Sequence, residues 1–350
     1  MKNLSIPFTK DGLILSLVKE KHLKHIYEIY MPVPHNIIGS GRPYVPEEVD
    51  EYERHFEEYL KQANELGIKV SLIANKQMIN TDELRSTSVK LCNFLRSISE
   101  KYKIHKIVLS NIFIIKQYGQ YFKDAGIEVE LSVMNNIASV SAFEQMLSTM
   151  PMVSSVCLGD SMIHDLDGIK YLKKTYPDIQ LKIIPNHGCL VDCIGAQQHH
   201  NYASCAYKKE DGNILNTSYN AELRLAHSIC ATCRVHITKV GRKLNEISFI
   251  RPEDIELYEP YIDLFKLSGR EHSAEKVISM IEAYGDKNYD GDIFDLFDMG
   301  ARIHGVPNKM FLKNFGEKRA NCNHKCYKCH YCESVCDFAK NNTNSKNIEV

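Results

Sequence analysis

Segments with the pattern of a strand alternate with segments that have the pattern of a helix along most of this 350-residue chain. Each strand–helix unit takes up about 25 to 45 residues, and such alternation is typical of a parallel sheet covered by helices. We predict eight strands, at Ile26–Tyr30, Val70–Ala74, Lys106–Ser110, Val129–Val133, Ser155–Leu158, Leu181–Ile184, Ile247–Ile250 and Leu264–Leu267. Eight units over about 260 residues predict an α/β fold, a (β/α)8 TIM-like barrel, with an open doubly wound sheet as the alternative.

The segments between these strands have apolar residues at helical spacing, and several have recognisable ends. Thr81-Asp82-Glu83 has the composition of a helix start, and Gly67 and Gly126 each follow a helical pattern. The expected helices are Pro46–Leu66, Thr81–Tyr102, Ile112–Ala125, Ser139–Met150, His164–Tyr176, Pro252–Tyr258 and Ser273–Tyr284.

In a barrel of this type the site lies at the carboxyl ends of the strands, so the residues that follow the strands are the first candidates. Nearly all of them are polar, although polar residues are also common in turns without any role in a site. The candidate catalytic residues are Asn75, Asn186, His187 and Arg251. The candidate substrate-binding residues are Arg42, Asp160 and Arg270, and Arg42, Arg251 and Arg270 are expected to bind an anionic group.

A group of cysteines follows the predicted strand Leu181–Ile184. Its members are Cys189, Cys193, Cys205, Cys230 and Cys233. Thiolates at CxxxC and CxxC spacing suit zinc or an iron–sulfur cluster better than magnesium or calcium. Cys189, Cys193 and Cys233 are the preferred ligands, and for the fourth we favour Cys230 over Cys205.

A second group of cysteines lies near the end of the chain. Cys326, Cys329, Cys332 and Cys336 have the C-x2-C-x2-C-x3-C spacing of bacterial ferredoxins and follow Cys322. Zinc bound by four cysteines is the alternative for this tail. The spacing from Cys322 to Cys329 also matches radical S-adenosylmethionine enzymes, which have it after an early strand and not at the end of the chain.

These features divide the chain into three parts. A barrel is expected over residues 1–315, with a cysteine-rich insertion at 186–240. A metal-binding tail is expected over 316–340, and a disordered end over 341–350, where polar residues dominate.

The net charge is −1, so composition gives no general argument for binding nucleic acid or a membrane. The first residues lack the pattern of a signal peptide, and no apolar run approaches the about 20 residues of a spanning helix. We therefore expect a cytoplasmic protein that has no membrane partner and whose clustered cysteines bind metal in preference to forming disulfides.

Four separated segments of the chain are distinctive: IYEIYMPVPHNIIGSGRPY, NHGCLVDC, FIRPEDIELYEPYIDLFKLSGR and CYKCHYC. Together they resemble proteins of peptidase family U32, and the resemblance extends from about His25 to Cys336. It implies a TIM-like barrel and a [4Fe–4S] cluster held by four cysteines. It also implies either oxygen-independent hydroxylation of RNA or ubiquinone precursors, or a collagenase-like protease activity.

The sequence departs from the usual pattern of that family in two places. Three residues, and not six, separate Cys189 from Cys193, and no Ser-Gly pair lies between them. A glutamate normally precedes the motif, whereas this chain has Lys182-Ile183-Ile184-Pro185. The specific substrate of the hydroxylases therefore cannot be transferred to this chain.

Three classes of function follow from these observations. The first is an iron–sulfur enzyme, with one cluster or two, that modifies an RNA base, a small aromatic molecule or a peptide by redox or hydroxylation chemistry. An electron donor or a partner subunit would serve such an enzyme. The second is a U32-type metal-dependent peptidase, although the sequence contains no GxSxG or HExxH motif. The third is a non-catalytic metal-binding module that docks a partner.

Overall fold

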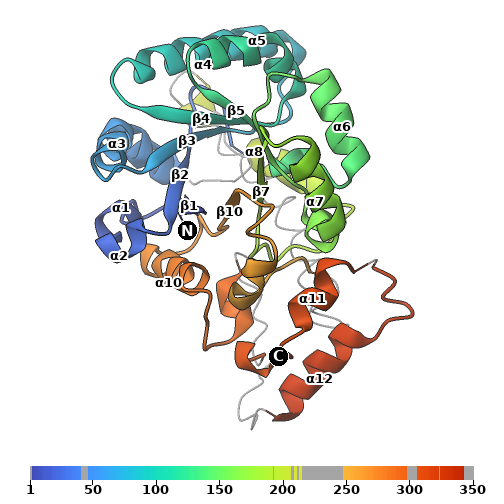
Figure 1. Ribbon diagram of the computed structural model, residues 1–350. Coiled ribbons are helices and arrows are strands. Elements are labelled where there is room, and N and C mark those ends of the chain that lie inside the picture. The colour runs from blue at the N-terminus through green and yellow to red at the C-terminus, as the bar shows by residue number, and fades with distance from the viewer. Residues whose placement is uncertain are drawn as a thin grey trace.

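The computed structural model describes residues 2–40, 46–191, 193–205, 209–210, 213–214, 247–297, 306–322 and 324–342. Eight parallel strands close into a barrel in the order β1-β10-β7-β6-β5-β4-β3-β2 (Figure 1). They are β1 (Leu4–Pro7), β2 (Ile26–Pro32), β3 (Lys69–Ala74), β4 (Ile104–Leu109), β5 (Glu128–Leu131), β6 (Ser155–Cys157), β7 (Gln180–Ile183) and β10 (Leu264–Lys266). The predicted (β/α)8-type barrel is confirmed.

Helices surround the barrel, and two more lie beyond it near the C-terminus (Figure 1). The helices around it are α1 (Ile14–Leu17), α2 (Glu20–Leu23), α3 (Pro46–Glu65), α4 (Thr81–Ser99), α5 (Ile112–Asp124), α6 (Val140–Thr149), α7 (Leu166–Thr175) and α10 (Ala274–Gly285). The remaining elements are α8 (Ala196–Cys205), α11 (Phe315–Ala320), α12 (Tyr331–Asn342), the two-residue strands β8 (Lys209–Glu210) and β9 (Asn213–Ile214), and the 3-10 helices η1 (Val133–Asn135), η2 (Asp160–His164), η3 (Pro252–Leu257), η4 (Ile293–Leu296) and η5 (Asn308–Met310).

Helix α5 shows how the sequence sets these boundaries. The side chain of Asn111 accepts a hydrogen bond from the backbone N–H of Ile114, which caps the first turn. Ile115 and Phe122 are buried on the face toward the sheet. Gly126 ends the element with a φ of 77°, a left-handed conformation that suits glycine.

One of the predicted barrel strands is wrong. Ile247–Ile250 is buried, but only Ile247 forms a bridge, and that bridge is antiparallel to Leu190. The strand that completes the barrel is β1, which was not predicted and which pairs in parallel with β2 and β10. The apolar run of Ile247–Ile250 reflects burial outside the barrel, and burial alone gives the same pattern as a core strand.

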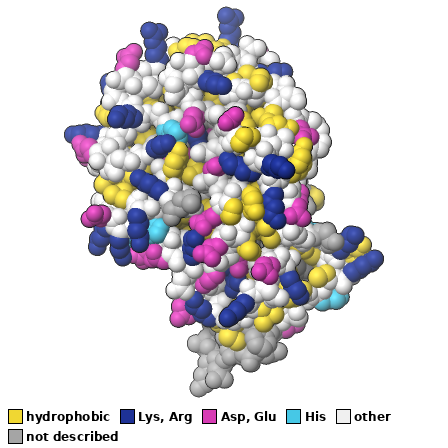
Figure 2. Space-filling model, in the orientation of Figure 1, with side chains coloured by type: hydrophobic (Ala, Val, Ile, Leu, Met, Phe, Trp, Pro, Cys, Tyr) yellow, Lys and Arg dark blue, Asp and Glu magenta, His cyan; other side chains and the backbone are white. Residues whose placement is uncertain are grey.

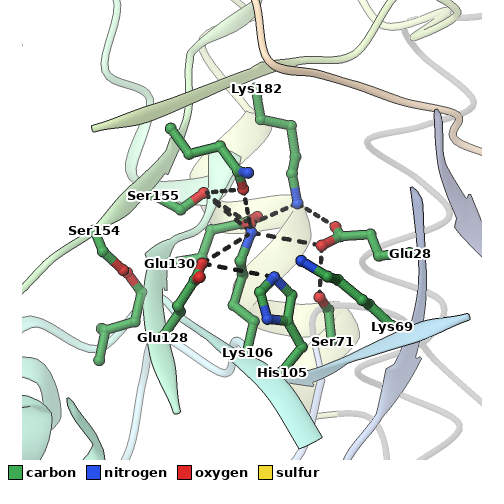
Figure 3. A network of polar contacts seen from close by, with 12 residues as sticks. Glu28, Lys69, Ser71, His105, Lys106, Glu128, Glu130, Ser154, Ser155 and Lys182 are labelled. Carbon is green, nitrogen blue, oxygen red and sulfur yellow. Dashed lines mark hydrogen bonds and ion pairs between the residues drawn. The ribbon is translucent and has the colours of Figure 1, made fainter. Parts of the chain in front are cut away.

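The barrel interior contains a network of buried charges that the strand pattern did not predict (Figure 3). The ammonium group of Lys182 lies 2.5 Å from carboxylate oxygens of both Glu28 and Glu130. Lys106 lies 3.5 Å from Glu28 and 3.2 Å from Glu130, and the hydroxyl groups of Ser5 and Ser71 donate to Glu28. Two lysines thus face two glutamates, so the charges of this layer balance, as buried charges generally must.

The tail is attached to the barrel through η2, which follows β6. The Nδ1 of His164 lies 3.0 Å from the backbone oxygen of Arg319, and Arg319 Nη2 lies 3.3 Å from His164 Nε2. Arg319 also donates to the backbone oxygen of Ile247 at 2.7 Å, and its guanidinium covers the ring of Phe249. A neutral imidazole fits this arrangement, because Nδ1 donates and Nε2 accepts.

We expect His164 to make the fold sensitive to acid. Burial and the neighbouring Arg319 hold its pKa at about 2, well below the usual 6.5. The unfolded chain takes up this proton below about pH 6.5 and the folded chain does not, so stability is lost as the pH falls from 6.5, by about 1.4 kcal/mol per pH unit. Unfolding by urea at pH 7 and pH 5 measures this effect.

His164→Gln should reduce the difference in unfolding free energy between the two pH values by roughly 2 kcal/mol. His55→Gln is a matched control, because His55 is exposed on α3. An unchanged pH dependence in the His164 variant would show that other groups cause the acid sensitivity.

The visible surface has no extended area of one charge. Lysine and arginine side chains are interspersed with aspartate and glutamate across the face in Figure 2, in agreement with the net charge of −1. Within the described part of the chain, none of the helices is both long and apolar enough to cross a membrane.

Candidate functional site

A pocket of about 330 Å³ lies at the carboxyl ends of the barrel strands, here called the mouth. Its walls come from the segments that follow β5, β6 and β7 and from the start of α8. The lining residues are Val133, Met134, Asn136, Asp160, Ser161, His187, Cys189, Leu190, Cys193, Ile194, Ala196, Gln197, His199 and His200. The mouth of the barrel is therefore concave and contains titratable and nucleophilic side chains, as catalytic sites of this fold do.

The pair of Asp160 and His187 is the best defined polar contact of this pocket. Asp160 Oδ2 lies 2.7 Å from His187 Nδ1, and both side chains are largely buried, with 20% and 10% of their surfaces exposed. The hydroxyl of Ser248 donates to the backbone oxygen of Asp160 at 2.5 Å and so fixes the segment after β6. A carboxylate beside Nδ1 keeps the proton on that nitrogen and makes Nε2 the basic one.

Two thiols line the same pocket. Cys189 follows His187 by two residues, and Cys193 lies just before α8, whose first turn begins with the backbone N–H of Ala196 donating to the oxygen of Cys193. Both thiols are partly exposed. Cys189 and Cys193 thus lie between β7 and α8, and Cys189 follows the carboxyl end of a barrel strand, as the sequence indicates.

A narrower cavity of about 50 Å³ adjoins this pocket, with which it shares Val133, Met134, His187 and His200. Its other lining residues are Tyr30, Ile73, Asn75, Ile184, Lys266, Ser268, Gly269 and Arg270. Asn75, His187 and Arg270, three of the residues chosen from the strand ends, thus lie around one space. Asp160 joins them through its contact with His187.

Asn186 lies at the mouth but is occupied by backbone contacts. Its amide nitrogen donates to the backbone oxygens of Ser268 and Leu296, each at 2.9 Å, and its oxygen accepts from the N–H of Ser268 at 2.8 Å. The side chain is fully buried. These bonds tie the end of β7 to the end of β10, so Asn186 has a clear structural role.

Arg251 does not follow a barrel strand, contrary to the prediction, because Ile247–Ile250 is not one. Its guanidinium forms two hydrogen bonds to the carboxylate of Asp254, at 2.6 and 2.8 Å, and lies over the rings of Phe311 and Phe315. It lines neither of the two cavities. The structure therefore places Arg251 in the packing between η3 and α11.

Several predicted site residues lie outside what the structure describes. These are Arg42, Cys230 and Cys233, together with the side chains of Cys205 in α8 and Cys336 in α12. Of the central group, Cys189 and Cys193 are the two thiols whose positions are known. Among the described residues, no group of three or more histidine, cysteine or acidic side chains has an arrangement that would hold a metal ion.

Four tail thiols belong to the segment between α11 and α12 and to the first turn of α12, namely those of Cys322, Cys326, Cys329 and Cys332. Burial raises the pKa of Cys332, the Arg319 guanidinium opposes this, and Cys322, Cys326 and Cys329 raise the pKa further. Soft sulfur donors at this spacing fit zinc or iron chemically. The tail thus remains a predicted metal site on the basis of its donor set.

Lys266 is a charged residue of the mouth that was not predicted from the sequence. It is the last residue of β10 and only 8% exposed, and it lines the narrow cavity. A signal was present, since a lysine inside the apolar run Leu264–Leu267 either interrupts a strand or points into the barrel. The interior residues Glu28, Lys106, Glu130 and Lys182 have the same signature.

No protein-family model matches the sequence. The chain is 25% identical over 332 residues to a curated protein named an uncharacterized protease, from Methanocaldococcus jannaschii. This match covers 93% of the present chain and 92% of the relative. The similarity therefore extends over most of both chains.

Two solved structures are similar at lower levels. A U32 peptidase matches with a TM-score of 0.47 and 12% identity, covering 59% of this chain and 77% of its own. SrfJ from Salmonella typhimurium matches with a TM-score of 0.37 and 12% identity, covering 58% and 63%. The similarity to a curated protein that is named a protease agrees with the peptidase family that the motifs resemble.

Proposed function

We propose that this protein is an enzyme that cleaves amide bonds of peptide-like substrates in the pocket at the mouth of the barrel. The observation that supports this most strongly is the hydrogen bond between Asp160 and His187 in a pocket that also contains the thiol of Cys189. A carboxylate, an imidazole and a thiol are the groups with which thiol-dependent hydrolases cleave acyl bonds. The similarity to a protein named a protease supports the same class.

Asp160, His187 and Cys189 each have a separate role in the proposed reaction. Asp160 orients the imidazole and stabilises its positive charge, and His187 Nε2 takes the proton of the Cys189 thiol. The thiolate sulfur bonds to the carbonyl carbon, the C–N bond breaks, and the amine leaves with the proton from His187. Water then hydrolyses the thioester, which returns the proton to the thiol and releases the carboxylic acid.

Alkylation and substitution of Cys189 test this proposal. Iodoacetamide should abolish the cleavage of a peptide library followed by mass spectrometry, and Cys189→Ala should reduce the rate by roughly 1,000-fold or more. Cys92→Ala is the control, because Cys92 is buried in α4, away from the mouth, where burial raises its pKa to about 11. Full activity of the Cys189→Ala variant would contradict the proposal.

A second candidate function uses the same thiols as ligands. Cys189 and Cys193 line one pocket, and two neighbouring thiols are more than a single nucleophile requires. With Cys230 and Cys233 they would hold a [4Fe–4S] cluster, as the resemblance implies. Such a cluster supplies electron transfer or Lewis-acid activation when bound.

In that case His187 and Asp160 would bind and orient a substrate and move its proton at the imidazole. The substrate would be an RNA base, a small aromatic molecule or a peptide, and an electron donor or partner subunit would be needed. Protein purified without oxygen distinguishes the two functions. Iron and acid-labile sulfide that disappear in Cys193→Ser would favour the cluster, while metal-free protein that still cleaves peptides favours the hydrolase.

A further inference from the structure

Two positively charged side chains at the mouth form no ion pair with any residue that the structure describes. Lys266 and Arg270 are 8% and 7% exposed, and both line the narrow cavity. Neither forms an ion pair with any residue that the structure describes, whereas the neighbouring Lys106 and Lys182 are both paired with glutamates. Among the described residues, Lys266 and Arg270 are thus buried cations of the narrow cavity without an ion pair.

The contacts of Lys266 leave its ammonium group available to the cavity. It lies 4.5 Å from the centre of the Tyr30 ring, and the Tyr30 hydroxyl is turned away to donate to the backbone oxygen of Leu267. The face of an aromatic ring attracts a cation but supplies no hydrogen-bond acceptor comparable to a carboxylate. Lys266 is therefore held in place without being neutralised.

Arg270 is directed into the same space. Its Nη1 is buried and has no hydrogen-bond partner in the part of the chain that the structure describes. The preceding Gly269 has a φ of 137°, a conformation that side chains rarely adopt, and this turn brings Arg270 back over the barrel after β10. A guanidinium is always charged, so burying one of its N–H groups without a partner has a cost that a bound anion would remove.

We infer that the narrow cavity binds a carboxylate group of the substrate between Lys266 and Arg270, so that these two residues select substrates with a free carboxylate near the bond that reacts. Arg270 offers paired N–H donors that match a carboxylate, and Lys266 adds a point charge. The cavity of about 50 Å³ admits a small group and not a whole residue with a large side chain. His187 lines both cavities, so an amide close to such a carboxylate would lie in the larger pocket.

This inference rests on the proposed function, because it names the substrate class of the same site: peptides cleaved close to their C-terminal carboxylate. Binding tests it separately from cleavage. The probes are N-acetyl-dialanine, as the free acid, and its C-terminal amide, titrated into the full chain with Cys189→Ser so that nothing is cleaved. Calorimetry should show that the free acid binds about 10- to 100-fold more tightly than the amide.

Variants locate the effect. Lys266→Met and Arg270→Gln should each lower the affinity for the free acid toward that of the amide. Lys69→Met is the matched control, because it removes one positive charge from an exposed position at the start of β3. Equal or undetectable affinity for the two peptides in the protein with intact Lys266 and Arg270 would overturn the inference.

Inorganic phosphate provides a second test of the anion class. Phosphate should compete with the free acid more weakly than acetate does at equal ionic strength; stronger competition by phosphate would overturn the assignment to carboxylates. If the free acid is preferred but no peptide is cleaved, the carboxylate site stands and the hydrolase proposal fails.

The pH dependence gives a readout that a merely structural lysine would not produce. Burial lowers the pKa of Lys266. The neighbouring Cys157 and Glu130 raise this pKa, whereas the positive charges of Lys182 and Arg270 lower it further. His187 and Tyr30 also face the cavity. Affinity for the free acid should therefore fall as the pH rises through this lowered pKa, and it should no longer do so in Lys266→Met. A pH-independent affinity in the parent protein would contradict a charged Lys266 as the binding group.

Discussion

Lys182→Met is expected to lower the free energy of unfolding by about 3 to 5 kcal/mol. Lys182 lies 2.5 Å from both Glu28 and Glu130, and all three side chains are almost completely buried. Without Lys182, the carboxylates of Glu28 and Glu130 are both paired with the single ammonium group of Lys106 in the centre of the barrel. Because domains of this kind are stable by only about 5 to 15 kcal/mol, denaturation by urea should show a midpoint far below that of the parent protein.

A double variant separates the loss of charge balance from the loss of packing. Glu130→Gln removes one of the two carboxylates that Lys182→Met leaves without a partner, so the pair of changes should cost less than the sum of the single ones. Lys116→Met, at an exposed position on α5, should change stability by less than about 0.5 kcal/mol. A full additivity of Lys182→Met and Glu130→Gln would show that the network contributes packing and not charge pairing.

The charged network also explains why the barrel could be predicted while its interior could not. Alternation of strands and helices depends on local spacing, which is visible in the sequence, and seven of the eight strands follow from it. The pairing of Glu28 with Lys182 joins residues 154 positions apart, and nothing local specifies it. A charge inside an apolar strand signals only that its partner lies somewhere in the fold.

The missing strand has a similar cause. β1 has four residues, Leu4–Pro7, and it ends in a proline, which weakens its pattern. The segment Ile247–Ile250 has a stronger apolar pattern because Phe249 packs against Phe297 and Phe315 outside the barrel. Both segments are buried, so burial does not show which of them is a barrel strand. Closure of the barrel does, because it requires a strand between β2 and β10.

Site residues could be predicted from their position after a strand. Whether the side chain of such a residue points into the cavity could not be predicted. Asn75, His187 and Arg270 follow strands and converge on the mouth. Asn186 follows the same strand as His187, yet backbone groups occupy its amide, because it lies against the end of β10. Residue type and position after a strand do not show whether a side chain faces the cavity or the neighbouring backbone.

Asp160→Asn is expected to lower the rate of peptide cleavage by about 100- to 10,000-fold while leaving the protein folded. An asparagine can present its amide to His187 Nδ1, and the imidazole then places its proton on Nε2, where the proposed reaction needs a base. Asparagine keeps the shape of the side chain and a hydrogen bond to the imidazole 2.7 Å away, so the loss of the carboxylate charge should cost little stability. Steady-state rates on a peptide substrate, with thermal unfolding measured in parallel, give both quantities.

The chain contains a second pair of the same kind that serves as a control. His25 Nε2 lies 3.2 Å from Asp286 Oδ1, at the opposite end of the barrel, after α10. Asp286→Asn removes the same chemical group from a histidine that lines neither cavity, so the cleavage rate should stay within about twofold of the parent value. Should Asp160→Asn and Asp286→Asn have equal effects on the rate, the imidazole of His187 is not the base, and the reaction must use another group of the mouth.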